Sequence, residues 1–284
     1  MSNRRNQARR SVDADMPPID TSVSENSLLK FATPTEIVEL PSKGALYPSD
    51  HPLYGQETIE IKYMTAKEED ILTSQSLLRK GLAVERLLKS VVVDKRIDPK
   101  SLFVGDRNAV LYATRITGYG AEYPAKVTCG NCSHVHDYEF DLENFKNGYT
   151  YFNPEESEFE FSDNGTFFVT LPKSGIKLEL RPLTGYDEDH LSKLQESKVK
   201  KKLPESTLTD MFRAMIVSAN GITDKGQISE FIENMPALDS KYLRAAYQSA
   251  VPNVEISEAV ECPNCGSETE TEVPFTVTFF WPDQ

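Results

Sequence analysis

Two short stretches, Cys129-Gly-Asn-Cys132 and Cys262-Pro-Asn-Cys265, contain every cysteine of this 284-residue chain. Two Cys-x-x-Cys pairs supply the four sulfur ligands of one tetrahedral zinc ion, so the sequence predicts a structural Zn²⁺ site of four thiolates. Each pair lies between β-prone stretches, which predicts that each forms the tip of a hairpin. The long segment from Ser133 to Glu261 separates the pairs. The fold therefore has to bring the two pairs together.

Other readings of the cysteines stay open at this stage. They include two disulfides, unligated thiols and a dithiol redox centre, although neither pair is followed by the helical periodicity that usually accompanies a redox motif. His134 and His136 follow the first pair and could complete a site with Cys129 and Cys132 alone. The alternative is that both histidines are solvent-facing residues of a turn.

The order of predicted elements before the first pair is repeated before the second. Glu57–Tyr63 and Ile176–Arg181 each alternate apolar and polar residues, as a half-buried strand does. Each strand is followed by a hydroxyl and an acid at capping-box spacing, in Thr65–Glu68 and in Thr184–Asp187. Both halves therefore predict a strand that leads into a helix.

Two apolar ladders with identical spacing come next, and each predicts one buried helix face. A short apolar patch and an Asp-capped helix follow each ladder. The offset between halves is 119 at the threonines (184 minus 65), 124 at the ladders (208 minus 84) and 133 at the cysteines (262 minus 129). Insertions in connecting loops explain this growth, which supports an internal duplication. The ladders are Val84, Leu87, Leu88, Val91 and Val92, and Leu208, Met211, Phe212, Met215 and Ile216.

These patterns predict an α+β fold with two similar strand-helix lobes, each ending in a zinc-ribbon-like Cys-x-x-Cys hairpin. We expect an extended, flexible N-terminal arm over residues 1–30, a first lobe over 31–146, an aromatic and acidic linker hairpin over 147–172, and a second lobe over 173–284. Zinc shared between the hairpins would then tie the two lobes together.

Composition excludes several function classes. The net charge is −13, so the body should repel nucleic acid, although Arg4, Arg5, Arg9 and Arg10 make the first ten residues basic. We find neither an apolar run of membrane-spanning length nor a secretory signal, which predicts a cytosolic protein. The sequence contains no phosphate-binding loop, dinucleotide fingerprint or nucleophile elbow. We therefore expect no enzymatic activity, no catalytic residue and no small-molecule substrate.

A further set of motifs resembles the baseplate hub assembly proteins of T4-like contractile-tailed phages. These motifs are Leu40–Tyr47, Met64–Leu72, Gly105-Asp-Arg107, Arg115–Gly120 and Cys129-x-x-Cys132. The resemblance covers about residues 35 to 145, with weaker similarity through Cys265. The arm and the aromatic linker lie outside it.

The resemblance implies a late-expressed structural or assembly protein of the phage tail, which binds other hub, tail-tube or tape-measure proteins. It implies a location in the virion tail baseplate, or in the host cytoplasm during assembly. A symmetric homo-oligomer within the baseplate is compatible with it. The alternative function is a zinc-ribbon adaptor or nucleic-acid-associated module of a cellular complex, because zinc ribbons are common in such complexes.

Overall fold

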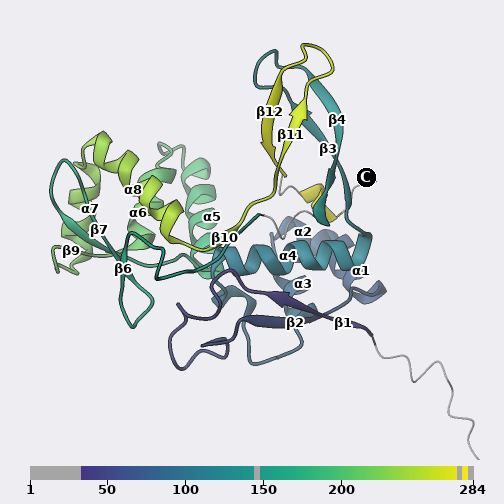
Figure 1. The fold of residues 1–284 in the computed structure, drawn as a ribbon, viewed down its shortest axis with the longest axis horizontal. Coiled ribbons are helices and arrows are strands. Elements are labelled where there is room, and N and C mark those ends of the chain that lie inside the picture. The colour runs from purple at the N-terminus through teal and green to yellow at the C-terminus, as the bar shows by residue number, and fades with distance from the viewer. Residues whose placement is uncertain (1–32, 144–147, 274–276, 281–284) are drawn as a thin grey trace, which may run out of the picture. The chain divides into compact units, whose positions relative to one another are not determined.

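The first half of the chain begins with a two-stranded antiparallel ribbon. In the computed structural model, which describes residues 33–143, 148–273 and 277–280, β1 (Thr35–Glu39) pairs with β2 (Thr58–Lys62). Three helices and a 3₁₀ turn follow before the long helix α4 (Val104–Tyr119). They are α1 (Ala66–Thr73), α2 (Gln75–Arg79), α3 (Ala83–Val91) and the turn Pro99–Ser101. Figure 1 shows α4 passing close to this ribbon.

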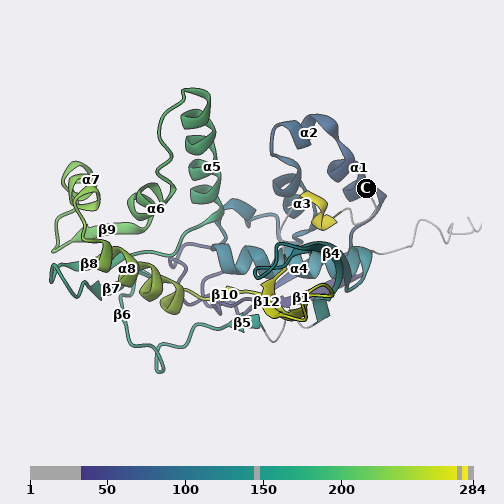
Figure 2. The same ribbon diagram turned by 90° about the horizontal axis from the view of Figure 1, so that it is seen from above.

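The second half begins with a four-stranded antiparallel sheet. Its strand order is β6 (Glu160–Phe161), β7 (Phe167–Thr170), β8 (Lys177–Leu180) and β9 (Ile216–Ala219). The same half contains four helices, and Figure 2 shows α8 near the strands of this sheet. They are α5 (Gly185–Lys200), α6 (Thr207–Met215), α7 (Lys225–Glu233) and α8 (Ala237–Ala250). With these, the described residues contain eight α-helices in a mixed α+β fold.

Both predicted capping boxes are confirmed. The Thr65 hydroxyl and backbone N–H donate to the Glu68 carboxylate at the start of α1, at 2.6 and 3.0 Å. Thr184 donates in the same way to Asp187 at the start of α5. The repeated Thr-x-x-acid spacing therefore gives the same local structure twice, because the capping box needs only neighbouring residues.

The central residues of both apolar ladders are confirmed as buried, whereas Val84 and Met211 are half-buried, and Val92 and Ile216 lie just past the ends of α3 and α6. Leu87, Leu88 and Val91 of α3 are fully buried, as are Phe212 and Met215 of α6. Leu208 was expected on the buried face but is 37% exposed. It lies in the first turn of α6, after an exposed connection from α5, so it precedes the part of the helix that packs.

The two helices predicted to be capped by aspartate, α4 and α8, have other residues at their N-caps, and the aspartates in their first turns bind distant loops. The N-cap residues are Phe103 and Pro236. Asp106 accepts hydrogen bonds from the backbone N–H and hydroxyl of Ser42, at 3.0 and 2.6 Å. Asp239 accepts from two backbone N–H groups, those of Lys173 and Ser174, at 2.7 and 2.9 Å. Each helix is thereby fastened to a loop far away in sequence.

Those two loops have closely similar sequences. One is Leu40-Pro-Ser-Lys-Gly44 between β1 and β2, and the other is Leu171-Pro-Lys-Ser-Gly175 between β7 and β8. Gly44 and Gly175 both have φ of 69°, in the left-handed region that glycine adopts without steric cost. A buried acid holds each turn against a helix.

Two hydrophobic cores are present in the described residues. One surrounds α4, and the other lies between the β7–β8 strands and helices α6, α7 and α8. The first core also includes residues from the end of the chain. Phe279, in the 3₁₀ turn Val277–Phe280, makes an edge contact with Tyr112 at 5.6 Å between ring centroids. Its carbonyl accepts a 2.9 Å hydrogen bond from the buried Arg115.

The predicted N-terminal arm, residues 1–30, lies outside the described residues. The start of the predicted linker pairs with the second half, because β5 (Tyr149–Thr150) is antiparallel to β10 (Asn253–Val254). The described helices include none that is both long enough and apolar enough to cross a membrane.

Candidate metal centre

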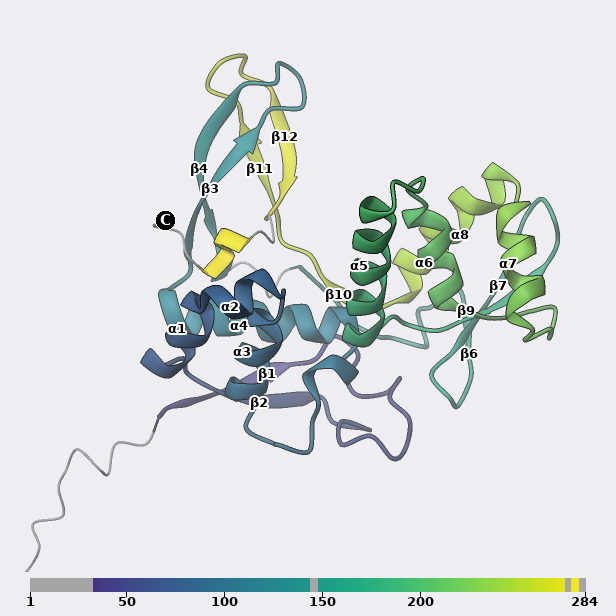
Figure 3. The ribbon, with the colours of Figure 1, turned by 180° about the vertical axis from the view of Figure 1, so that it is seen from behind.

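Each Cys-x-x-Cys stretch lies in the connection between two antiparallel strands. The first connects β3 (Glu122–Thr128) to β4 (Val135–Asp141), and the second connects β11 (Ser257–Glu261) to β12 (Glu268–Glu272). The two strand pairs lie side by side in Figures 1 and 3. Glu258 joins them, because its carboxylate accepts from the Tyr138 hydroxyl and the Asp141 backbone N–H, both at 3.0 Å.

This arrangement brings all four sulfur atoms together. The four Sγ atoms lie within 4.8 Å of one another. The Cys129 and Cys265 sulfurs are 3.8 Å apart, and those of Cys132 and Cys262 are 3.7 Å apart. Four sulfurs at a zinc–sulfur distance of about 2.3 Å form a tetrahedron with edges of about 3.8 Å. Both of these cross-hairpin distances match that edge, so the cluster could hold a zinc-sized ion.

The two cysteine loops have the same backbone geometry. The Cys129 carbonyl accepts from the Ser133 N–H at 2.9 Å, and the Cys262 carbonyl accepts from the Gly266 N–H at 2.9 Å. Ser133 and Gly266 have positive φ values of 57° and 66°. These tight turns leave the backbone N–H groups near the sulfurs, and that of Asn131 donates to the Cys129 Sγ at 3.4 Å.

Two asparagines that the sequence analysis did not single out connect the loops. The Asn131 side-chain amide donates to the Cys265 Sγ at 3.7 Å, and that of Asn264 donates to the Cys132 Sγ at 3.6 Å. Each loop therefore supports a sulfur of the other. The available signal was that both stretches have asparagine immediately before their second cysteine.

The thiols have different acidities for identifiable reasons. The Asn264 amide and the His134 backbone N–H hold the pKa of the Cys132 thiol at about 6. Backbone N–H groups of Cys132 and Asn131 lower the pKa of Cys129. Burial raises the pKa of Cys262 to about 11. A bound cation would favour the thiolate at every position, because only the thiolate is a metal ligand.

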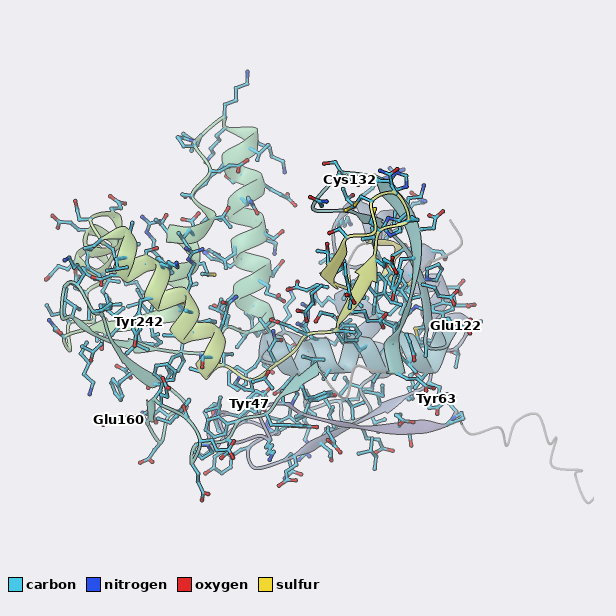
Figure 4. The ribbon with its side chains drawn as sticks, turned by 45° about the horizontal axis from the view of Figure 1, so that its top comes forward. Tyr47, Tyr63, Glu122, Cys132, Glu160 and Tyr242 are labelled. Atoms are coloured by element: carbon cyan, nitrogen blue, oxygen red, sulfur yellow. The ribbon has the colours of Figure 1, made fainter. Side chains whose placement is uncertain are left out.

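The cluster has an inner and an outer side. Cys129 and Cys262 are 4% and 2% exposed, whereas Cys132 and Cys265 lie nearer solvent. Figure 4 shows Cys132 at the tip of the hairpins. Four thiolates would occupy every position of a tetrahedral ion, so this donor set suits a structural ion and leaves no place for a reacting water.

The two nearby histidines lie outside this group. Among the described residues, the cluster that could hold a metal ion contains the four cysteines and neither histidine. The His134 and His136 rings stack with 5.9 Å between their centroids. Both ring nitrogens of His136 are buried without a hydrogen-bond partner in the described part of the chain.

Comparison with known proteins identifies the family. Residues 33–281 match the family described as T4 bacteriophage base plate protein, and the chain belongs to that family. Searches among curated proteins and among solved structures gave no match. The family match confirms the resemblance found in the sequence, and it extends across most of the chain. Membership supports a structural role in a phage baseplate and association with the virion tail.

Proposed function

We propose that this member of the T4 baseplate family builds the hub of a contractile tail by binding hub, tail-tube or tape-measure proteins. The observation that carries the proposal is the family match over residues 33–281, which includes both halves and all four cysteines. A role in binding also accords with a candidate metal centre whose four thiolates leave no coordination position for catalysis.

The ion in the cluster is zinc in this proposal, held by Cys129, Cys132, Cys262 and Cys265. Soft thiolate ligands and near-tetrahedral sulfur spacing favour zinc over the hard cations Mg²⁺ and Ca²⁺. One ion would join two hairpins that are separated by more than a hundred residues of chain. The zinc therefore acts as a structural cross-link.

An internal duplication is the second part of the proposal, with lobes at 31–146 and 173–284 joined by 147–172. Lys62 pairs with Glu68 at 2.8 Å, and Arg181 pairs with Asp187 at 2.6 Å. The basic residues of the two ion pairs are 119 positions apart in sequence (181 minus 62), and so are the acidic residues (187 minus 68). The similar Leu-Pro loops and the acids that hold them give independent support. Two related lobes could offer two related surfaces to different subunits.

Purification from infected cells tests the proposed function. An affinity tag placed after Gln284 should retain hub, tube or tape-measure proteins, identified by mass spectrometry. Comparison of finished tails with assembly intermediates would then separate a resident subunit from a transient assembly factor. Recovery of the tagged chain free of every tail protein at the time of tail assembly would contradict the hub role. Retention of host DNA in a salt-sensitive manner would favour the adaptor alternative.

A further inference from the structure

The outer edge of β1 is open at Ile37, whereas farther along the strand the Glu39 carbonyl accepts from the Tyr149 hydroxyl at 3.2 Å. The Tyr63 N–H donates to the Pro34 carbonyl, and the Leu40 N–H donates to the Glu57 carbonyl. Because hydrogen-bonding direction alternates along an antiparallel strand, the backbone groups of Ile37 point away from β2. No described residue bonds to them, and the Ile37 side chain is 68% exposed. An open edge of this kind is a template for another strand.

A groove of about 650 Å³ lies beside this edge. Consecutive residues of β1 form one side, and Ala113 and Ile116 of α4 contribute apolar surface on another. Figure 4 labels Tyr63, which also lines the groove. A strand that paired with β1 could therefore place alternate side chains against an apolar surface.

The second half shows how the corresponding edge is filled. There the strand that precedes a Leu-Pro loop is β7, as β1 precedes the loop at Leu40. The outer edge of β7 is covered by β6, with Phe161 opposite Phe167. The rings of these two residues lie 5.6 Å apart between centroids. In the described residues β1 has no strand in the position of β6.

The charge around the groove selects the side chains that an added strand would carry. Glu36, Glu39 and Glu143 line it, and no lysine or arginine is among its described lining residues. The Tyr63 and Tyr151 hydroxyls donate to Glu36 and Glu39. Covering the three carboxylates with an apolar or acidic segment would still remove their charges from water without a counter-ion. A segment with basic residues would instead pair with them.

From these observations we propose that β1 and the adjacent groove bind an extended segment of another baseplate protein by strand addition. In that segment, aromatic or aliphatic side chains alternate with lysine or arginine. Backbone hydrogen bonds to Ile37 give affinity, and the glutamates with the apolar wall give selectivity, as in other strand-addition sites. The proposal rests on the proposed binding function and names one surface that performs it.

Peptide binding to the full chain tests this site. The probe is Lys-Phe-Lys-Val-Lys-Phe, and the matched control is Glu-Phe-Glu-Val-Glu-Phe, both measured by calorimetry at low and high salt. The basic peptide should bind, and its affinity should fall when salt is added. Its affinity should exceed that of the acidic control by about tenfold or more. Equal binding of the two peptides, or no binding of the basic peptide, overturns the proposal.

Two variants separate strand addition from general charge attraction. Ile37→Pro removes an N–H that β2 does not use, and Ile37→Lys changes an exposed side chain, so both should retain the thermal transition. Each variant should lower the affinity for the basic peptide by about tenfold. The matched control Glu270→Gln, on the exposed side of β12, should not. Unchanged affinity in both Ile37 variants rules the site out.

The occupant itself is also open to refutation. Sedimentation should show that the wild-type chain does not associate with itself through Ile37. Self-association that is present in the wild type and lost in either Ile37 variant would be the opposite result. In that case a second copy of this chain occupies the groove, and the assignment to another baseplate protein is wrong. Failure of the peptide experiments would leave hub co-purification and metal content unaffected, so it is distinguishable from failure of the proposed function.

Discussion

Loss of one cysteine pair should remove the metal ion completely and weaken the whole fold. In the variant Cys262→Ser with Cys265→Ser, we expect metal content to fall from one zinc per chain to none. The reason is geometric, because each sulfur of the first loop lies close to a sulfur of the second loop. The Cys132 and Cys262 sulfurs are 3.7 Å apart, and the Cys129 and Cys265 sulfurs are 3.8 Å apart. Two remaining thiolates do not satisfy a tetrahedral ion.

The size of the stability loss follows from the length of chain that the ion closes. Cys132 and Cys262 are 130 residues apart. The loop-closure entropy of a cross-link over such a length corresponds to about 5 kcal/mol at room temperature, as an upper value. For a chain of this size, that loss corresponds to a fall in melting temperature of about 10 °C.

Elemental analysis and differential scanning calorimetry measure both effects. Gly130→Ala is the matched control in the same loop, because a Cβ at Gly130 would meet nothing within 4 Å. That control should keep its metal and its melting temperature. Substituting Cys129 and Cys132 as well should cause little additional loss of stability, since removal of either pair already prevents a shared site from binding the ion. Two zinc ions per wild-type chain, or half of the metal retained in the variant, would refute the shared site.

Four further outcomes are expected. Chelation should expose a cleavage site between Gly148 and Gly165 before the cores unfold, and an unchanged proteolysis pattern would count against a zinc cross-link between lobes. Asn264→Ala should raise the pKa of the metal-free Cys132 thiol above its value of about 6, seen as slower alkylation near neutral pH, while Asn220→Ala, remote from the sulfurs, should not. Burial would raise the pKa of Glu68, but hydrogen bonds from Lys62, Ser90 and Thr65 lower it to about 2. The stabilisation from this carboxylate, about 3 kcal/mol as an upper value, is therefore present near neutral pH and lost as pH falls from about 4 toward 2. Glu68→Gln should flatten that part of the acid-unfolding profile. Deleting residues 1–30 should leave the thermal transition unchanged but reduce binding to hub intermediates, and equal binding would remove the case for a docking arm.

Local sequence patterns predicted local structure well. The Thr-x-x-acid spacing identified both capping boxes because all the participating groups lie within one helical turn. The cysteine pairs identified the candidate metal centre because four soft ligands in two pairs have few other uses. Periodicity identified the buried faces of α3 and α6, but it did not show that packing begins after Leu208.

Contacts between distant segments were not predictable in the same way. Nothing near Asp106 indicates that its hydrogen-bond donors, Ser42 and Tyr47, lie 64 and 59 residues earlier in the chain. Nor does the sequence around Arg115 indicate a partner at Phe279, 164 residues later. Such contacts depend on how whole loops close against the core, which periodicity does not report. The similar loops at Leu40 and Leu171 were a usable signal, since two like loops imply two like partners.

The charge on the hairpins gives a physical reason for a metal ion at their tips. In the β11–β12 pair, Glu261 lies directly opposite Glu268, and Glu270 and Glu272 continue along the same exposed side. Like charges in opposed positions destabilise a strand pair, and an isolated two-stranded hairpin is marginal even without them. Glu258 ties this pair to β3–β4 at one place, but the tips lie beyond that contact. An ion bound by cysteines of both tips would hold the tips together against this repulsion, because four thiolates and one Zn²⁺ carry a net charge of about −2 and do not neutralise the glutamates. This predicts that the acidic hairpin is the first element to separate when the ion is removed, and that added salt reduces the separation.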